Sequence, residues 1–140
     1  MQLAVSGRVF SGLGEGKYYV GHPEYQKRFE QCLGYVPYPG TLNVRLGDGS
    51  QIQGLKRLRS MRGVELQSFT LNGETFCSVK CFDGELRGER VSLLLIEATH
   101  YNETVAELIS PTYLRDRLGL EDGDDVSFTI NVPDPTPSMQ

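Results

Sequence analysis

The chain has 140 residues and a mass of 15.6 kDa, which is the size of a single domain. It carries 14 lysines and arginines against 18 aspartates and glutamates, a net charge of −4. That balance argues against charge-driven binding to nucleic acid or to an anionic membrane. No apolar run approaches the ~20 residues of a membrane-spanning helix, the N-terminus lacks signal-peptide features, and three cysteines cannot form a closed disulfide framework. We therefore expect a cytoplasmic protein with reduced thiols.

The first third of the chain predicts short strands and loops. Residues 2–10 alternate, with Leu3, Val5, Gly7 and Val9 on one face, which predicts a strand. Residues 11–16 form a glycine-dense loop, and the short run at 17–20 predicts a returning strand. Residues 41–46 alternate again and predict another strand, and residues 47–54 predict a loop.

Between these strands the sequence predicts one helix. Pro23 suits a first helical turn, Tyr25 and Phe29 recur at helical spacing, and Gly34 can end the helix. The segment that follows contains Pro37 and Pro39 and cannot be regular structure.

The second half of the chain predicts further strands joined by tight turns. Residues 62–71 and 74–82 read as a hairpin across Asn72-Gly73, and Asp83-Gly84 predicts a second turn. The apolar run at 91–98 predicts a central strand.

The C-terminal part predicts a short helix and a last strand. Residues 111–118 carry proline at the start and Gly119 after the end, as helices do. A turn at 122–124 leads into an alternating strand at 126–132. Residues 133–140 contain three prolines and are expected to be a flexible tail.

These elements predict a mostly β domain over residues 1–132, with six to eight strands and two short helices. Small β-rich chains close into barrels, which removes exposed strand edges. The run at 118–126 resembles the helix-to-strand corner of cradle-loop (RIFT-related) barrels. That group includes DNA-binding proteins and enzymes, so the corner indicates fold and leaves function open.

A glycine-rich loop is the first candidate site. Gly12, Gly14 and Gly16 stand at alternate positions, where backbone N–H groups can converge on an anion, and Lys17 can add a positive charge. The spacing matches neither a Walker A loop nor the protein-kinase glycine loop. From the residues alone, a phosphate cradle and a strained hairpin corner fit equally well.

A second candidate is the pair Thr41 and Asn43. Alternation in a strand places both side chains on one face, where a hydroxyl and an amide oxygen can ligate a hard cation. Both are neutral, so they would hold Mg²⁺ only with phosphate oxygens completing its shell. A rigid turn leading into a strand is the alternative interpretation.

Two charged residues are weaker candidates. Glu107 lies in an apolar stretch and is either on an exposed strand face or directed into a site. Arg115 is either solvated or in contact with phosphate. Cys77 and Cys81 have no paired histidine, so buried thiols are favoured over a zinc site.

Taken in order, the motifs resemble the archaeal CTP-dependent riboflavin kinase family. The likeness spans roughly residues 5–130 and is carried by residues 12–19, 33–35, 37–43, 109–111, 114–115, 118–120 and 123–124. It implies a cradle-loop barrel that transfers the terminal phosphoryl group of CTP to the ribityl 5′-hydroxyl of riboflavin, giving FMN and CDP. Some family members carry an N-terminal winged-helix domain, which this chain is expected to lack.

The resemblance also implies roles for individual residues. Nucleotide contacts fall on Gly12, Leu13, Gly14, Glu15, Gly16, Lys17, Thr112, Tyr113, Leu114 and Arg115; Mg²⁺ ligands on Thr41 and Asn43; flavin contacts on Thr99 and Glu107. The match is weaker over residues 99–107 than in the glycine loop and the turn that holds Thr41 and Asn43. As the one carboxylate assigned near the flavin, Glu107 is our candidate for orienting or deprotonating the attacking hydroxyl.

Other functions remain open at this point. A kinase of the same fold could use another acceptor or nucleotide, and a binding protein without catalysis could keep the same motifs. A barrel-type DNA-binding transcriptional regulator is disfavoured by the net charge and by the single basic cluster, Lys56, Arg57, Arg59 and Arg62. We expect riboflavin and CTP as partners, no nucleic acid and no membrane, and a closed barrel is compatible with a monomer.

Overall fold

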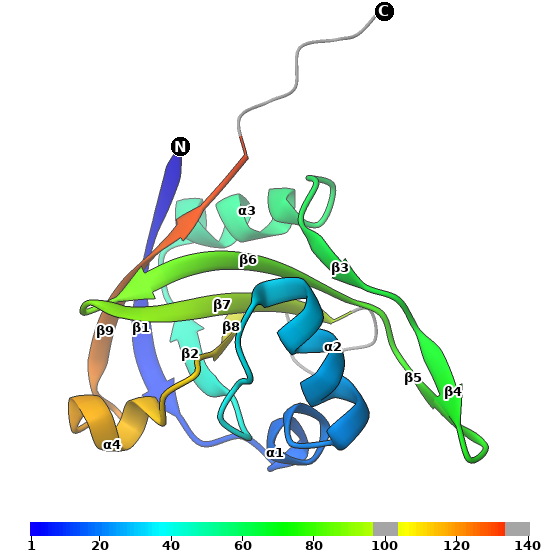
Figure 1. Cartoon of the computed structure of the whole chain (residues 1–140). Coiled ribbons are helices and arrows are strands. Elements are labelled where there is room, and N and C mark those ends of the chain that lie inside the picture. Colours follow the sequence, from blue (N-terminus) through cyan, green and yellow to red (C-terminus); the bar gives the residue numbers. More distant parts are fainter. Residues whose placement is uncertain (97–103, 134–140) are drawn as a thin grey trace, which may run out of the picture.

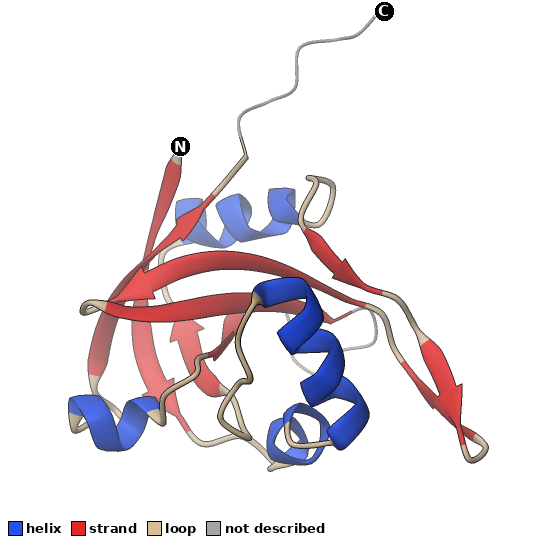
Figure 2. Ribbon diagram, in the orientation of Figure 1, coloured by secondary structure: helices blue, strands red, loops and turns tan. Residues whose placement is uncertain are grey.

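Six antiparallel strands close into a barrel in the computed structural model, which describes residues 1–96 and 104–133 (Figure 1). The strands are β1 (Gln2–Phe10), β2 (Leu42–Leu46), β3 (Val64–Leu66), β4 (Phe69–Leu71), β5 (Glu74–Phe76), β6 (Val79–Leu86), β7 (Glu89–Ile96), β8 (Val105–Ile109) and β9 (Asp125–Asn131). The helices are α1 (Glu15–Val20), α2 (Pro23–Leu33), α3 (Gly49–Leu58) and α4 (Leu114–Leu118). Around the barrel the strand order is β6-β7-β8-β2-β1-β9, and the helices lie outside it (Figure 2). The predicted mostly β barrel is confirmed.

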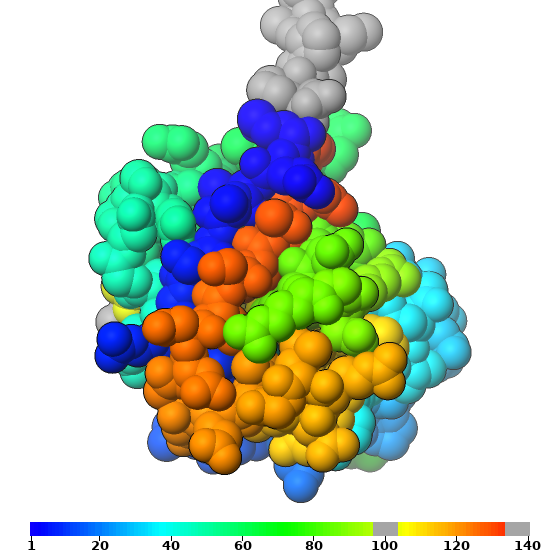
Figure 3. All heavy atoms as spheres, turned by 90° about the vertical axis from the view of Figure 1, so that its left-hand side faces the viewer, coloured from blue at the N-terminus to red at the C-terminus, as the bar shows by residue number. Residues whose placement is uncertain are grey.

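The barrel closes where β9 pairs with both β1 and β6. Figure 3 shows β9 in orange between β1 in blue and the green β6–β7 hairpin. Gly84 stands at the crossing, opposite Ile130, and a side chain there would collide with the backbone oxygen of Thr129. The predicted turn at Asp83-Gly84 is therefore wrong, because both residues lie within β6 and the glycine allows β9 to approach that strand closely. The chain turns later, at Arg87-Gly88, where both φ angles are positive.

Alternate residues of the barrel strands fill its interior. Val5 and Val9 of β1, Val44 of β2, Leu93 of β7 and Leu108 of β8 are each at most 1% exposed. They belong to one apolar cluster. The predicted strands at 2–10, 41–46, 91–98 and 126–132 correspond to β1, β2, β7 and β9, although residues 97 and 98 lie outside the described part of the chain.

Helix α3 covers part of the barrel where a loop was predicted over residues 47–54. The Asp48 side chain accepts hydrogen bonds from the backbone N–H groups of Ser50 and Gln51, which caps the helix. Leu55 and Leu58 are buried against the barrel core. Three glycines in residues 47–54 weaken the helical signal there, so the loop prediction was wrong. The described residues contain four helices where two were predicted.

Helix α1 replaces the strand predicted over residues 17–20. It begins after Gly14, whose φ of 87° turns the chain into the helix, and it ends at Val20, which is buried. Gly16 lies so close to Thr41 that a Cβ there would be 2.6 Å from the hydroxyl oxygen Oγ1. This packing against Thr41, which stands immediately before β2, is invisible in a six-residue window of the sequence.

Helix α2 agrees with its prediction and packs on the outer face of the barrel. Its N-cap is His22, whose Nδ1 accepts the backbone N–H of Glu24, and Gly34 ends it with a φ of 82°. Tyr25, Phe29 and Leu33 are its buried residues. They form a second apolar cluster, here called the α2 cluster, with side chains of β5, β6, β7 and β8.

The arm at the right of Figure 1 is the hairpin β4–β5. Asn72 and Gly73 both have positive φ, as predicted for the turn of this hairpin. The rings of Phe69 and Phe76 stack across the two strands, with centroids 4.8 Å apart. The base of the arm thereby reaches the α2 cluster.

The C-terminal corner also follows the sequence. Helix α4 ends at Gly119 with a φ of 64°, and Gly123 turns the chain into β9 with a φ of 93°. The tail predicted at 133–140 lies, apart from Pro133, outside the described residues. Within residues 1–96 and 104–133, no helix has the length and apolar character needed to cross a membrane.

Candidate functional site

Four residues form a row across adjacent strands on the outer face of the barrel. Asn43 of β2 stands opposite Phe10 of β1 on one side and opposite Glu107 of β8 on the other. Glu107 in turn stands opposite Leu94 of β7. Opposed residues of antiparallel strands share a face, and Leu94 belongs to the α2 cluster, so Asn43 and Glu107 face the helices. The glycine loop leaves β1 immediately after Phe10, directly beside Asn43.

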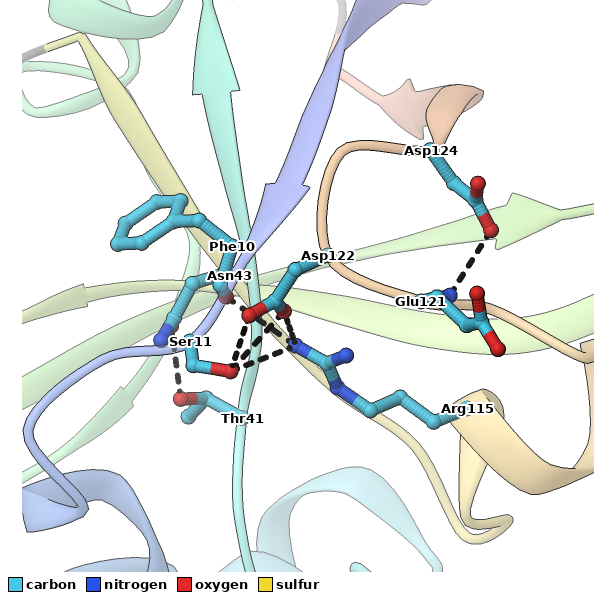
Figure 4. Close-up of polar contacts among 8 residues, drawn as sticks. All are labelled: Phe10, Ser11, Thr41, Asn43, Arg115, Glu121, Asp122 and Asp124. Atoms are coloured by element: carbon cyan, nitrogen blue, oxygen red, sulfur yellow. Dashed lines mark hydrogen bonds and ion pairs between the residues drawn. The ribbon is translucent and has the colours of Figure 1, made fainter.

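Thr41 and Asn43 lie on the same face, as the alternation predicted. The Thr41 hydroxyl donates to Asn43 Oδ1 over 2.9 Å (Figure 4). Asn43 is 6% exposed. Within the described residues, no group of three or more His, Cys, Asp or Glu side chains is arranged to hold a metal ion. The two neutral oxygens and the adjacent loop thus offer a cation only part of its coordination shell.

An aromatic pocket lies between the barrel face, α1, α2 and the base of the β4–β5 arm. Four rings contribute to its wall, those of Tyr19, Tyr25, Phe29 and Phe76. Its lining also includes Glu15 and Gly16 of α1, Thr41, and the buried Glu107 of β8. A pocket with aromatic walls and a few polar groups suits a planar aromatic ligand that carries a polar chain.

Glu107 is a buried carboxyl in this pocket, being 9% exposed. Burial raises its pKa to about 7, and the nearby negative charge of Glu15 contributes to the same shift. Of the two placements open from the sequence, the structure has the one directed into a site. A carboxyl group with a pKa near neutrality can accept or release a proton at physiological pH.

A second, smaller pocket, here called the loop pocket, adjoins the first. It is lined by residues 38–42, by Leu108 and Ser110, and by residues 112–115. The rings of Tyr38 and Tyr113 stack at a centroid distance of 4.6 Å and are each about half exposed. Thr41 lines both pockets, so the two cavities adjoin at this residue, beside the glycine loop and Asn43.

A polar cluster ties the start of the glycine loop to α4. Arg115 Nη2 donates to Asp122 Oδ1 over 2.7 Å, and the Ser11 hydroxyl donates to the same carboxylate (Figure 4). These two hydrogen bonds hold the pKa of Asp122 below its ordinary value. Arg115 is thus neither a freely solvated side chain nor a buried one, since its side chain is 24% exposed.

Most of the residues singled out in the sequence lie around these two pockets. Thr112, Tyr113, Leu114 and Arg115 line the loop pocket, whereas Glu15, Gly16 and Glu107 line the aromatic pocket. Gly12, Leu13, Gly14 and Lys17 lie in the exposed loop and first turn beside them, and Leu13 is 81% exposed. Thr99 lies outside the described residues.

Sequence reasoning missed the wall of the aromatic pocket and the carboxylate of Asp122. Tyr25 and Phe29 were expected only as the buried face of a helix. Phe76 lies 4.8 Å from His22 and 5.6 Å from Tyr25 between ring centroids, contacts that no local pattern predicts. Asp122 was assigned only to a turn, and a turn acidic residue carries no sequence signal for an arginine partner.

The chain matches one family model over most of its length. The model is named CTP-dep_RFKase, is described as "Domain of unknown function DUF120", and matches residues 9–130. The matched range contains the glycine loop, the Thr41–Asn43 pair, Glu107 and Arg115.

Curated relatives give a consistent picture. The chain is 41% identical over 128 residues to a protein of Archaeoglobus fulgidus named "Riboflavin kinase", a match covering 91% of the chain and 54% of that protein. It is 42% identical over 129 residues to one of the same name from Methanococcoides burtonii, covering 92% and 57%. A third, from Pyrobaculum islandicum, is 40% identical over 130 residues, covering 93% and 61%. The chain spans little more than half the length of these relatives.

Proposed function

Because the chain belongs to the CTP-dependent riboflavin kinase family, we propose that it phosphorylates riboflavin at the ribityl 5′-hydroxyl with CTP as the donor, giving FMN and CDP. The family supports the reaction class. The choice of riboflavin and CTP as this chain's own substrates rests on the resemblance of its motifs and on the names of its relatives.

The meeting of two pockets at Thr41 carries this proposal. A phosphoryl transfer brings an acceptor and a nucleotide together at one point, and it depends on positioning and charge neutralisation rather than on a covalent enzyme intermediate. The aromatic pocket would take the flavin ring, and the loop pocket with the glycine loop would take the nucleotide. The reacting groups would then meet at the residue that both pockets share.

The distance between the Thr41 and Asn43 oxygens fits two adjacent ligands of one Mg²⁺ ion. Adjacent ligands of an octahedral Mg²⁺ lie about 2.9 Å apart, given metal–oxygen distances of about 2.0–2.1 Å. The Thr41 and Asn43 oxygens are 2.9 Å apart. We propose that these two side chains hold Mg²⁺ together with phosphate oxygens, where the ion would neutralise charge on the phosphates.

Replacing Asn43 with alanine is expected to raise the Mg²⁺ concentration needed for half-maximal activity about tenfold, because one of two protein oxygens is lost. Thr41→Val, which keeps the shape of the side chain, should act in the same direction. Asn131→Ala, an exposed asparagine on β9, is the matched control. An unchanged Mg²⁺ titration in both site variants, with folding intact, would refute the ligand role.

Glu107 is the group we assign to the acceptor. Its carboxylate would accept the proton of the ribityl 5′-hydroxyl as that oxygen forms a bond to the terminal phosphorus of CTP. The bond between that phosphorus and the bridging oxygen breaks, and CDP leaves with the electron pair. A pKa of about 7 leaves enough carboxylate at neutral pH for this role.

The direct test is a chromatographic assay. Purified protein is incubated with riboflavin and Mg²⁺, with CTP in one reaction and ATP in a second, and FMN is quantified. We expect FMN from CTP and little from ATP. FMN mainly from ATP would keep the reaction and overturn the donor, whereas no FMN with either nucleotide from folded protein would overturn the proposed reaction.

A further inference from the structure

Arg115 is held by groups from two other parts of the chain. Its Nη2 lies 2.7 Å from Asp122 Oδ1, 3.4 Å from Ser11 Oγ and 3.3 Å from the backbone oxygen of Phe10. The Ser11 hydroxyl donates to the Asp122 carboxylate, whose two oxygens are 2.9 and 2.8 Å away. Helix α4, the corner before β9 and the start of the glycine loop therefore meet at one carboxylate (Figure 4).

These contacts are made by one nitrogen of the guanidinium group, Nη2. The hydrogen bonds and the ion pair that Arg115 makes with other described residues are all made by Nη2. Arg115 also lines the loop pocket. A guanidinium group fixed at Nη2 in this way keeps donors for an anion in that pocket, and its fixed plane lowers the entropy lost when the anion binds.

We propose that Asp122 is a positioning residue for the nucleotide. It fixes the Arg115 guanidinium group and the start of the glycine loop on a common anchor, so that both reach the phosphates of one nucleoside di- or triphosphate. This inference rests on the proposed function, since it takes the loop pocket as the nucleotide site. Asp122 itself has no contact with the substrate in this arrangement.

The negative charge of Asp122 would by itself lower the affinity for a nucleotide, because it repels phosphates. The Asp122 side chain is 56% exposed, so water and salt screen that repulsion. The hydrogen bonds at 2.7 to 2.9 Å are directional and short-range, and screening affects them less. We therefore expect the orienting effect to exceed the repulsion, and the two effects have opposite signs on nucleotide affinity.

The experiment compares Asp122→Ala, Asp122→Asn and the intact protein. Calorimetry measures CDP affinity in the presence of Mg²⁺, and flavin fluorescence measures FMN affinity on the same samples. Asp125→Ala is the matched control: it removes the same charge three positions along the chain, where Asp125 pairs with Arg8 over 3.3 Å.

We expect Asp122→Ala to weaken CDP binding about tenfold while FMN affinity stays within about twofold. Asp122→Asn keeps an oxygen acceptor for Arg115 and should recover most of the affinity. Tighter CDP binding by Asp122→Ala, or equal loss of CDP and FMN affinity, would overturn the positioning role. If the intact protein binds FMN but no CDP, the proposed nucleotide site itself fails, and the inference fails with it.

Discussion

Glu107→Gln is expected to lower turnover about 100-fold and, at the same time, to make the protein more stable above pH 7. The turnover falls because glutamine cannot accept the proton of the attacking hydroxyl. The stability rises because a buried carboxylate no longer has to be ionised in the folded state. Nucleotide affinity should change little, because the loop pocket is lined by other residues.

The pH dependence follows from the two pKa values. Glu107 titrates near 4.5 in the unfolded chain and near 7 in the fold, so the folded state binds more protons between these values. The stability that this group contributes is complete below pH 4.5 and is lost as the pH rises through 7. The difference between these two pKa values corresponds to roughly 3 kcal/mol, which is the largest gain that glutamine could bring at pH 8.

Denaturant unfolding of the protein without Mg²⁺ at pH 4.5 and pH 8 measures this gain. The variant and the intact protein should differ little at pH 4.5 and most at pH 8. Glu85→Gln, an exposed glutamate on β6, should change stability by less than ~0.5 kcal/mol at either pH. Near-normal turnover in Glu107→Gln would remove Glu107 from the reaction.

Gly16→Ala should lower turnover about 100-fold with only a small effect on stability. The added Cβ would lie 2.6 Å from Thr41 Oγ1 and 3.1 Å from Thr41 Cγ2, so either the side chain of Thr41 or helix α1 must move. A displacement of about 1 Å at a reacting centre costs on the order of 100-fold in rate. The Mg²⁺ concentration for half-maximal activity should rise as well.

Gly49→Ala is the control for this substitution. Gly49 is also in the first turn of a helix, and a Cβ there meets no atom within 4 Å. That variant should keep full activity. Full activity in Gly16→Ala would mean that Thr41 can adjust without loss and that its place beside the glycine loop has no bearing on the reaction.

The barrel could be predicted because its strands carry their own pattern. Val5 and Val9 share one face of β1, Val44 stands opposite Val9 on β2, and the turn at Asn72-Gly73 has a strong local signal. Helices α1 and α3 could not be predicted in the same way. Their glycines weaken the helical signal, and both segments are stabilised by packing, α1 through Val20 and α3 through Leu55 and Leu58, with α3 also capped by Asp48.

The candidate site, too, could be predicted only where the local strand pattern was sufficient. Thr41 and Asn43 share a strand face, so alternation predicted that they lie together. Glu107 was ambiguous, because strand alternation says which residues share a face but not which face a helix covers. The link between Ser11, Arg115 and Asp122 joins residues about 100 positions apart, and no periodic pattern encodes it.

The pairing of β9 with β1 has a consequence for the order in which the chain folds. Gln2 stands opposite Asn131, 129 positions along the chain, so β1 waits for β9 before either is paired along this edge. Contacts of such long range are slow to form, because a large loop must close before they contribute. Until Asp125–Asn131 has emerged, β1 and β6 each present an open edge to other chains. Nascent chains are therefore most exposed to intermolecular strand pairing just before β9 leaves the ribosome.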